Sequence, residues 1–146
     1  MNRLIPLAGP LFLGLAAIGV SAGAEQPAAA PVTVENYYKL IPGGTSEWKA
    51  LYVKNHYPIL QQLIKEGLLK SVNLYERRFH AAKPAWDYKI VLVFRDWQAM
   101  EEARSREPEI IASLYPNKEL HEREERRRWE VTLEHWDDVL SAVPLE

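Results

Sequence analysis

The sequence predicts an α+β fold in which a four-stranded antiparallel sheet carries its helices on one face. Predicted strands and helical regions follow one another in the order β-α-β-β-α-β, which is a split βαβ arrangement. The two middle strands are joined by a short loop and should form an antiparallel hairpin. The third strand is apolar on both sides, so both faces of the sheet should be covered.

Residues 1–24 have the layout of a cleavable secretory signal. Arg3 precedes an apolar stretch over Leu4–Val20, and Ser21–Ala24 ends in an A-x-A site. The alternative is an uncleaved anchor, but a spanning helix needs about 20 apolar residues, and two prolines and three glycines interrupt this stretch. We therefore expect cleavage after Ala24, a flexible leader over 25–31, a single domain over 32–146, and a secreted or periplasmic location.

The first strand and the first helix follow the leader. Val32–Ile41 is rich in β-branched and aromatic residues and precedes a Pro-Gly-Gly turn, which predicts a strand. A helix follows, capped by Thr45 or Ser46, because apolar residues then recur at spacings of three and four. Pro58 lies inside this pattern and removes one backbone donor, so the helix should kink or break at residues 55–58.

The hairpin that comes next carries the argument for a partner subunit. Ser71–His80 and Tyr88–Arg95 are predicted as its strands, and every position from Ile90 to Phe94 is apolar. Helices cover only one face, so the other face would expose a larger apolar patch than monomers usually tolerate. We therefore expect a second copy of the chain to cover it, in a sheet-to-sheet homodimer.

The last third of the chain supplies the second helical region and the fourth strand. Asp96 should cap the helical region, which Pro108 and Pro116 cut into pieces. The tail Asp137–Leu145 alternates in the manner of a strand. The last helical piece, from Lys118 to about residue 133, contains three favourable i, i+4 pairs: Glu119/Arg123, Glu122/Arg126 and Glu124/Arg128.

Charge and composition restrict the partners. Without Arg3 the mature chain carries 17 Lys and Arg against 20 Asp and Glu, which gives no electrostatic reason to expect nucleic acid or an anionic membrane. The chain has no cysteine, which excludes disulfides, thiolate metal ligands and a thiol nucleophile. We expect a small organic ligand or a protein as partner, and no membrane association after cleavage.

Several of these features resemble one known superfamily. The chain resembles the dimeric α+β barrels, which are ferredoxin-like, in four features. These are the order of elements, the two-sided sheet, the proline-interrupted helix at Asn55–Pro58, and the Arg95-Asp96-Trp97 turn into the second helical region. That superfamily includes antibiotic-biosynthesis monooxygenases, stress-responsive barrel proteins and muconolactone-isomerase-like enzymes. The resemblance covers Val32–Leu145 and implies the fold, the dimer and a pocket between helices and sheet. It assigns no catalytic residue, because no catalytic motif of the superfamily matches.

The strongest polar cluster joins residues 55–58 to the second strand. Glu76, Arg78 and His80 share one strand face, and if that face is turned to the helices they would line a pocket opposite the kink at His56. His56 or His80 could then act as a general base, and Arg78 could hold a carboxylate or enolate. The other interpretation is structural, with exposed ion pairs along the strand and a hydrogen-bonded histidine under the helix.

Further candidates border the same expected pocket. Trp86, in the hairpin loop, either covers the mouth of the pocket or docks the loop on its own subunit. No metal site is expected, because His121 stands alone among carboxylates whose charges the Glu–Arg pairs explain. The candidate ligand-binding residues are Tyr52, Asn55, Glu76 and Trp86.

Two functions are compatible with the sequence. The first is an exported protein that binds a small organic molecule without a metal or organic cofactor; as an enzyme it would be a cofactor-independent monooxygenase or isomerase. The alternative is a non-enzymatic cell-envelope module whose charged helix, Glu119–Arg128, faces a protein partner. An open cavity between sheet and helices favours the first, and a filled interior favours the second.

Overall fold

A computed structural model describes residues 29–79, 85–143 and 145. The predicted signal (1–24), residues 25–28 of the leader, and the candidate base His80 lie outside the described residues. Eight elements make up the described chain: β1 (Val32–Leu40), α1 (Thr45–Asn55), α2 (Tyr57–Lys65), β2 (Leu69–Glu76), β3 (Tyr88–Phe94), α3 (Trp97–Leu114), α4 (Lys118–Glu130) and β4 (Thr132–Ser141).

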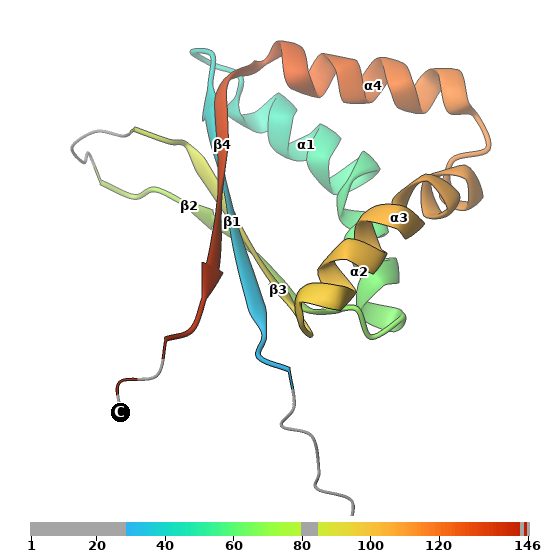
Figure 1. The fold of residues 1–146 in the computed structure, drawn as a ribbon. Coiled ribbons are helices and arrows are strands. Elements are labelled where there is room, and N and C mark those ends of the chain that lie inside the picture. Colours follow the sequence, from blue (N-terminus) through green and yellow to red (C-terminus); the bar gives the residue numbers. More distant parts are fainter. Residues whose placement is uncertain (1–28, 80–84, 144, 146) are drawn as a thin grey trace, which may run out of the picture.

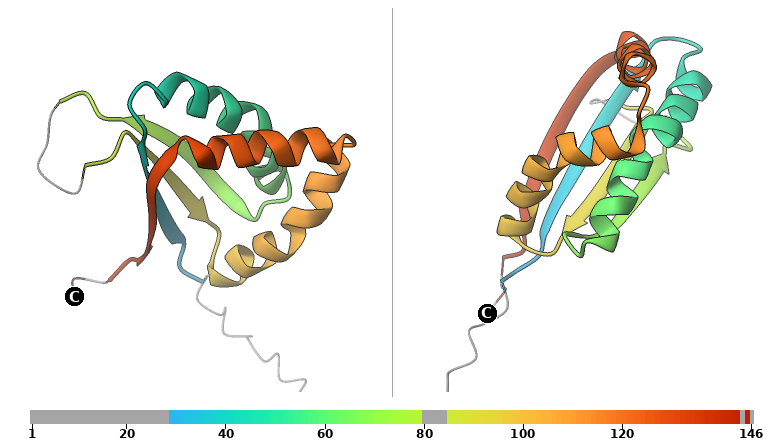
Figure 2. Two further views of the ribbon diagram at one scale, coloured as in Figure 1. Left: turned by 90° about the horizontal axis from the view of Figure 1, so that it is seen from above. Right: turned by 90° about the vertical axis from the view of Figure 1, so that its right-hand side faces the viewer.

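The sheet has the predicted architecture. Its strands lie in the order β2-β3-β1-β4, and every neighbouring pair is antiparallel. The helices all pack on one face and leave the other face free of secondary structure among the described residues (Figures 1 and 2). The predicted β-α-β-β-α-β order is confirmed, with each helical region made of two consecutive helices.

The first helical region breaks where proline was expected to break it. α1 ends at Asn55 and α2 begins at Tyr57, with His56 between them. Pro58 falls in the first turn of α2, where a missing backbone N–H breaks no helical bond. The predicted side-chain cap at Thr45 or Ser46 is wrong, because Thr45 is already helical and Gly44 takes the cap position without a side-chain hydrogen bond.

The second helical region differs from the prediction at its proline. Asp96 caps α3 as predicted, since its Oδ1 accepts the Ala99 N–H at 2.7 Å. Pro108 does not cut the helix: α3 continues to Leu114 and bends instead (Figure 2). Pro108 is exposed, so solvent can satisfy the carbonyl that its ring leaves without a donor.

Two strand boundaries were also misplaced. The fourth strand was predicted over Asp137–Leu145, but β4 begins at Thr132, directly after α4, and pairs with β1 along its whole length. The second strand was predicted over Ser71–His80, but β2 spans Leu69–Glu76. In both cases the ends of the strand are decided by its pairing with a neighbouring strand. The local sequence pattern carries no information about that pairing.

Aromatic side chains make the centre of the core. Trp48 on α1 is 0% exposed, and its ring lies 4.5 Å from that of Tyr38, 5.1 Å from Tyr52 and 5.3 Å from Tyr88. Its indole N–H donates to Oγ1 of Thr132 at 3.0 Å. One side chain therefore ties α1 to β1, to β3 and to the start of β4.

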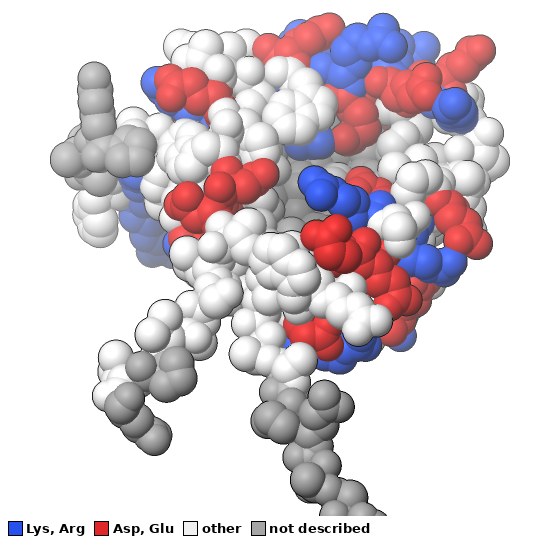
Figure 3. All heavy atoms as spheres, in the orientation of Figure 1, with Lys and Arg blue, Asp and Glu red and all other residues white. Residues whose placement is uncertain are grey.

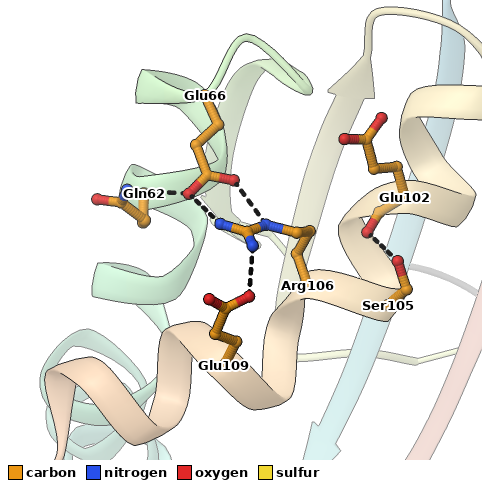
Figure 4. A network of polar contacts seen from close by, with 6 residues as sticks. All are labelled: Gln62, Glu66, Glu102, Ser105, Arg106 and Glu109. Carbon is orange, nitrogen blue, oxygen red and sulfur yellow. Dashed lines mark hydrogen bonds and ion pairs between the residues drawn. The ribbon is translucent and has the colours of Figure 1, made fainter.

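A polar network fixes α3 against α2. Glu66, the C-cap residue of α2, accepts from Gln62 at 3.0 Å and from Nη2 of Arg106 on α3 at 3.3 Å (Figure 4). Arg106 also pairs with Glu109, one turn further along α3. These contacts lie partly in solvent, so their main effect is to orient the two helices rather than to stabilise the fold strongly.

Charges on α4 are paired differently from the prediction. Glu124 accepts from Lys54 at 2.6 Å and from Asn55 at 3.0 Å, and both of these partners belong to α1. Arg127 pairs with Glu47 of α1 at 2.7 Å. Arg128, expected on the surface, is 3% exposed. The predicted i, i+4 pairs give way because α4 turns one of its charged faces toward α1 and the sheet.

The helix-free face of the sheet is less apolar than predicted. Strand register and the alternation with buried residues give it both ion pairs and apolar side chains. Glu35 pairs with Lys89 at 3.1 Å near its middle, and Lys39 pairs with Glu134 at one end. Its larger aliphatic and aromatic residues are Tyr37, Tyr75, Val91, Val93, Trp136 and Leu140.

Candidate functional site

The main candidate site is a hollow between the sheet and helices α2 and α3, called here the sheet–helix hollow. Its volume is about 520 Å³, which is within the range of small-molecule pockets. Figure 3 shows the hollow from its open side, with acidic and basic side chains around the mouth. The lining comes from β1, the end of β3, the second half of β4, the α1–α2 break, α2, and the first three turns of α3.

The hollow has an apolar floor and a polar rim. Val34, Leu92 and Phe94 of the sheet form the floor, and α2 adds the apolar residues Ile59, Leu60 and Leu63. The rim carries Asn36, His56, Glu101, Arg104, Glu107 and Asp137. Three carboxylates against one guanidinium leave this rim with a net negative charge, which disfavours anions in the hollow.

His56 occupies the break between α1 and α2 and lines the hollow. Burial, with the nearby charge of Arg128 as second cause, lowers the pKa of His56 to about 4. The ring is therefore neutral near pH 7 and can donate one hydrogen bond and accept another. A base of such low pKa is a weak proton acceptor at neutral pH.

Behind the hollow lies a buried arginine. Nε and Nη2 of Arg128 donate to the two carboxylate oxygens of Glu125 at 3.1 and 2.7 Å. The guanidinium also lies over the rings of Trp129, at 4.8 Å, and Tyr52, at 5.9 Å. Its positive charge acts on both His56 and Glu107 of the rim.

Two carboxylates of the rim, Glu107 and Asp137, have surroundings that affect their chemistry. Burial, and then the charge of Glu125, raises the pKa of Glu107. Asp137 accepts from Nδ2 of Asn36 at 2.5 Å and lies 3.2 Å from Nε2 of His135. Nδ1 of His135 in turn lies 2.9 Å from the carbonyl oxygen of Tyr37. These bonds fix the β1–β4 side of the hollow.

The structure does not bring the predicted polar cluster together. Glu76 and Arg78 border a separate hollow of about 320 Å³ beside Thr45, at the other end of the sheet from His56. The reason is the length of α1: its 11 residues carry the chain about 16 Å away from Thr45 before His56 is reached. Arg78 and His56 therefore cannot act on one ligand in this arrangement.

Trp86 also lies away from the sheet–helix hollow. Its ring packs edge-on against Tyr37 at 5.9 Å, and the guanidinium of Arg77 lies 4.5 Å from its centroid. Tyr37 in turn stacks on Trp136 at 5.1 Å, on the helix-free face. Of the two interpretations of Trp86, the arrangement supports docking of the hairpin loop on its own subunit.

Tyr52 and Asn55 are buried beside the hollow but do not line it. Tyr52 is 3% exposed and packs between Trp48 and His56, with ring distances of 5.1 and 5.2 Å. Asn55 is 1% exposed and donates to Glu124 of α4. Both residues hold the α1–α2 break in place, which is a positioning role for His56.

Sequence reasoning missed most of the rim. Met100, Arg104 and Glu107 stand on one side of α3 at spacings of four and three, a signal that was readable once α3 was taken as continuous through Pro108. Asn36 and Asp137 gave no such signal. They are neighbours only through the pairing of β1 with β4, whose register places them opposite each other.

No helix among residues 29–79 and 85–143 has the length and apolar character needed to cross a bilayer. No group of three or more histidines and carboxylates in these ranges is arranged to hold a metal ion.

Comparison with solved structures identifies the fold. A dimeric ferredoxin-like protein from an uncultured marine organism superimposes with a TM-score of 0.53 and 8% identity, over 80% of this chain and 90% of that one. A NIPSNAP family protein from Agrobacterium tumefaciens gives 0.51 and 11%, over 81% and 90%. A variant of SnoaB, a cofactor-independent oxygenase from Streptomyces nogalater, gives 0.50 and 12%, over 78% and 94%.

No family model matches the chain, and no curated protein gives a significant sequence match. At such low identities the structural likeness shows the fold alone. The resemblance drawn from the sequence is confirmed at that level: the chain has the ferredoxin-like fold of the dimeric α+β barrel proteins.

Proposed function

We propose that the chain is an exported, homodimeric protein that binds a small organic molecule in the sheet–helix hollow. The observation that carries the proposal is the hollow itself, which joins an apolar floor to a rim of convergent polar groups. Its volume of about 520 Å³ accommodates a molecule of two or three fused rings. SnoaB, which has a similar fold, is a cofactor-independent oxygenase.

Binding is supported more strongly than catalysis. His56 and Arg78, predicted as base and anion partner, line separate cavities. A His56 with a pKa near 4 takes up a proton poorly at neutral pH. We therefore place binding first, and monooxygenase or isomerase chemistry enters only if a bound substrate is found to turn over.

The alternative of a protein-interaction module has less support. It needs a filled interior and a charged α4 free for a partner. The sheet–helix hollow is open (Figure 3), and Glu124 and Arg127 of α4 are engaged with α1 within the same chain. The first requirement is not met by the described residues, and two charges of α4 are held by α1, although Glu119, Glu122, Arg123 and Arg126 are exposed.

Filling the hollow tests the proposal directly. Met100 is partly buried and lines the hollow from α3, so Met100→Trp should occupy part of its volume. We expect affinity for the neutral fluorescent probe N-phenyl-1-naphthylamine to fall about ten-fold or more. Gln98→Trp, on the same helix but exposed and outside the hollow, is the matched control and should bind as the natural protein does. Absence of probe binding to the natural protein would refute the proposal.

The homodimer forms through the helix-free face of the sheet. Val91, Trp136 and Leu140 stand on this face, and no helix covers them. The Glu35–Lys89 pair shows that the interface would be mixed rather than wholly apolar. One structurally similar protein is described as dimeric, which supports a second copy as the occupant.

A charge placed on this face should separate the subunits. Val91→Lys adds an unpaired ammonium near the middle of β3, inside the proposed interface. We expect the dimer dissociation constant to rise about 100-fold or more, measured by sedimentation equilibrium at micromolar concentration. Val53→Lys, at an exposed apolar position on α1, is the control and should remain dimeric. A natural protein that sediments as a monomer would overturn this part of the proposal.

Export rests on the sequence of residues 1–24. Arg3, the apolar stretch and the A-x-A site predict cleavage after Ala24. The mature protein recovered from its host outside the cytoplasm should begin at Glu25, as read by N-terminal sequencing or intact mass. An intact N-terminus at Met1 on the recovered protein would contradict this.

A further inference from the structure

A second hollow lies between helices α3 and α4, called here the α3–α4 hollow. Its volume is about 550 Å³, similar to that of the sheet–helix hollow. Its apolar lining comes from Pro108, Ile111, Ala112, Tyr115 and Pro116. A ligand confined to the sheet–helix hollow leaves this second space empty.

Contacts with α1 fix the walls of the α3–α4 hollow. The ring of Tyr115, at the end of α3, stacks on that of His121 of α4 at 4.2 Å. The Tyr115 hydroxyl donates to the carbonyl oxygen of Lys54 at 3.1 Å, and Nε2 of His121 lies 3.4 Å from that of Asn55. The hollow is therefore a feature of the packed fold, because three helices hold its walls.

Two charged side chains form the boundary between the hollows. Arg104 and Glu107 stand about one turn apart on α3, and both line both hollows. Neither forms a hydrogen bond or an ion pair with another described residue, whereas Arg106 on the same helix is held by Glu66 and Glu109. Long side chains that nothing holds can turn aside, and their stems can lie along an apolar ligand. The two hollows are therefore neighbouring compartments with a movable partition.

The length of α3 sets the length of a ligand that occupies both compartments. Met100 lines the sheet–helix hollow, and Ala112 lines the α3–α4 hollow up to about 18 Å further along the helix. An extended hydrocarbon chain advances about 1.2 Å per bond, as an extended backbone does, so a chain of about 14 carbons covers most of this distance. A compact ligand of two or three rings fills only one compartment.

The charges around the two hollows restrict the head group of such a chain. Four carboxylates, of Glu101, Glu107, Glu122 and Asp137, stand against two cationic side chains, of Arg104 and Lys118. Lys118 also lies 3.5 Å from Glu122, which offsets its charge. An anionic head group would meet a net negative surface, and an uncharged one would not.

We propose that the two hollows form one elongated site, which binds a single unbranched hydrocarbon chain of about 14 carbons with an uncharged head group. The chain passes between the compartments at Arg104 and Glu107, and its head group stays in solvent. This inference rests on the proposed ligand-binding function and names the chemical class of the ligand.

Tetradecyl maltoside, used below its critical micelle concentration, tests the inference on the natural protein. Isothermal titration calorimetry should give one molecule per subunit. Nuclear Overhauser effects should connect its chain to the δ1 methyl groups of both Ile59, in the sheet–helix hollow, and Ile111, in the α3–α4 hollow. At a stoichiometry of one, only a chain that passes from one compartment to the other contacts both methyl groups.

Filling the second compartment should shorten the chain that the site accepts. Ala112 is exposed and lines the α3–α4 hollow, so Ala112→Trp should occupy part of its volume without removing a core side chain. We expect affinity for tetradecyl maltoside to fall about ten-fold or more, because several methylenes lose their apolar contacts. Displacement of N-phenyl-1-naphthylamine by octyl maltoside should be unchanged, which also shows that the sheet–helix hollow is still folded.

Two further comparisons complete the test. Ser105→Trp is the matched control, because Ser105 is exposed on the same helix and lines neither hollow, and it should bind tetradecyl maltoside as the natural protein does. Tetradecyl sulfate has the same chain with an anionic head group and should bind the natural protein more weakly than the maltoside.

The outcomes separate this inference from the proposed function. If neither N-phenyl-1-naphthylamine nor the maltosides bind the natural protein, the proposed ligand-binding function fails. If the naphthylamine binds but tetradecyl maltoside does not, or its chain contacts Ile59 without Ile111, the elongated site is overturned while the sheet–helix hollow remains a binding site. Tighter binding of tetradecyl sulfate than of the maltoside would overturn the uncharged head group. The measurements on the natural protein decide this even if Ala112→Trp does not fold.

Discussion

Replacing Trp48 by alanine should lower the free energy of unfolding by roughly 3–5 kcal/mol. The indole is 0% exposed and packs on Tyr38, Tyr52 and Tyr88, so its removal leaves a cavity that three large rings can only partly fill. It also leaves Oγ1 of Thr132 without its donor at the start of β4. A loss of this size is a large part of the stability of a domain of this length.

Urea unfolding followed by circular dichroism at one fixed protein concentration measures the effect, since a dimer's stability depends on concentration. Trp48→Phe keeps a ring in the stack but loses the indole N–H, and should cost roughly 1–2 kcal/mol. Trp97→Ala is the matched exposed control, because Trp97 is 55% exposed, and should cost about 1 kcal/mol or less. Equal effects of Trp48→Ala and Trp97→Ala would contradict the packing described for the core.

Acid should destabilise the protein through His56 before its carboxylates titrate. In the unfolded chain a histidine titrates near pH 6.5, whereas burial lowers the pKa of His56 in the folded protein to about 4. Between these values the unfolded chain binds more protons, so the free energy of unfolding falls as the pH drops from 6.5 toward 4. The full shift corresponds to a loss of roughly 3 kcal/mol.

Comparison with His56→Gln isolates this effect from other groups. The variant should lose the slope between pH 6.5 and 4.5, while both proteins share the contributions of other titrating residues. Glu66 and Glu124, with lowered pKa values, stabilise at higher pH and lose that contribution only as the pH falls through their folded pKa values. Glu107, with a raised pKa, acts in the opposite direction. An NMR titration that placed the His56 pKa above 6 would contradict the buried position.

The sequence predicted the elements whose signals are local. Apolar spacing gave the first helical region, Pro58 gave its break, and Asp96 gave the start of α3, because each depends on backbone geometry within a few residues. The same reasoning failed at Pro108. Whether a proline ends a helix or bends it depends on whether its neighbours face solvent, and that is a property of the packed molecule.

The candidate site was predicted only in part. The structure places His56 in the lining of the hollow between sheet and helices, and the break that positions it there is visible in the sequence. Glu76 and Arg78, which the sequence analysis placed opposite His56, lie at the other end of the sheet. The distance between these residues and His56 follows from the length and direction of α1. Knowing which residues share one face of a single strand gives no information about that distance.

Arg128 is a residue whose burial could not be predicted from the sequence. Within the run of alternating charges on α4 it looks like every other surface arginine, and only the packing of α4 across α1 buries it beside Glu125 and Trp129. By itself the sequence determined the order of the elements, the sheet and the apolar residues that hold it, because hydrophobic periodicity is local. Tertiary structure alone decided which polar groups share the hollow, since residues 36, 56, 107 and 137 meet only when strand register and helix packing bring distant parts of the chain together.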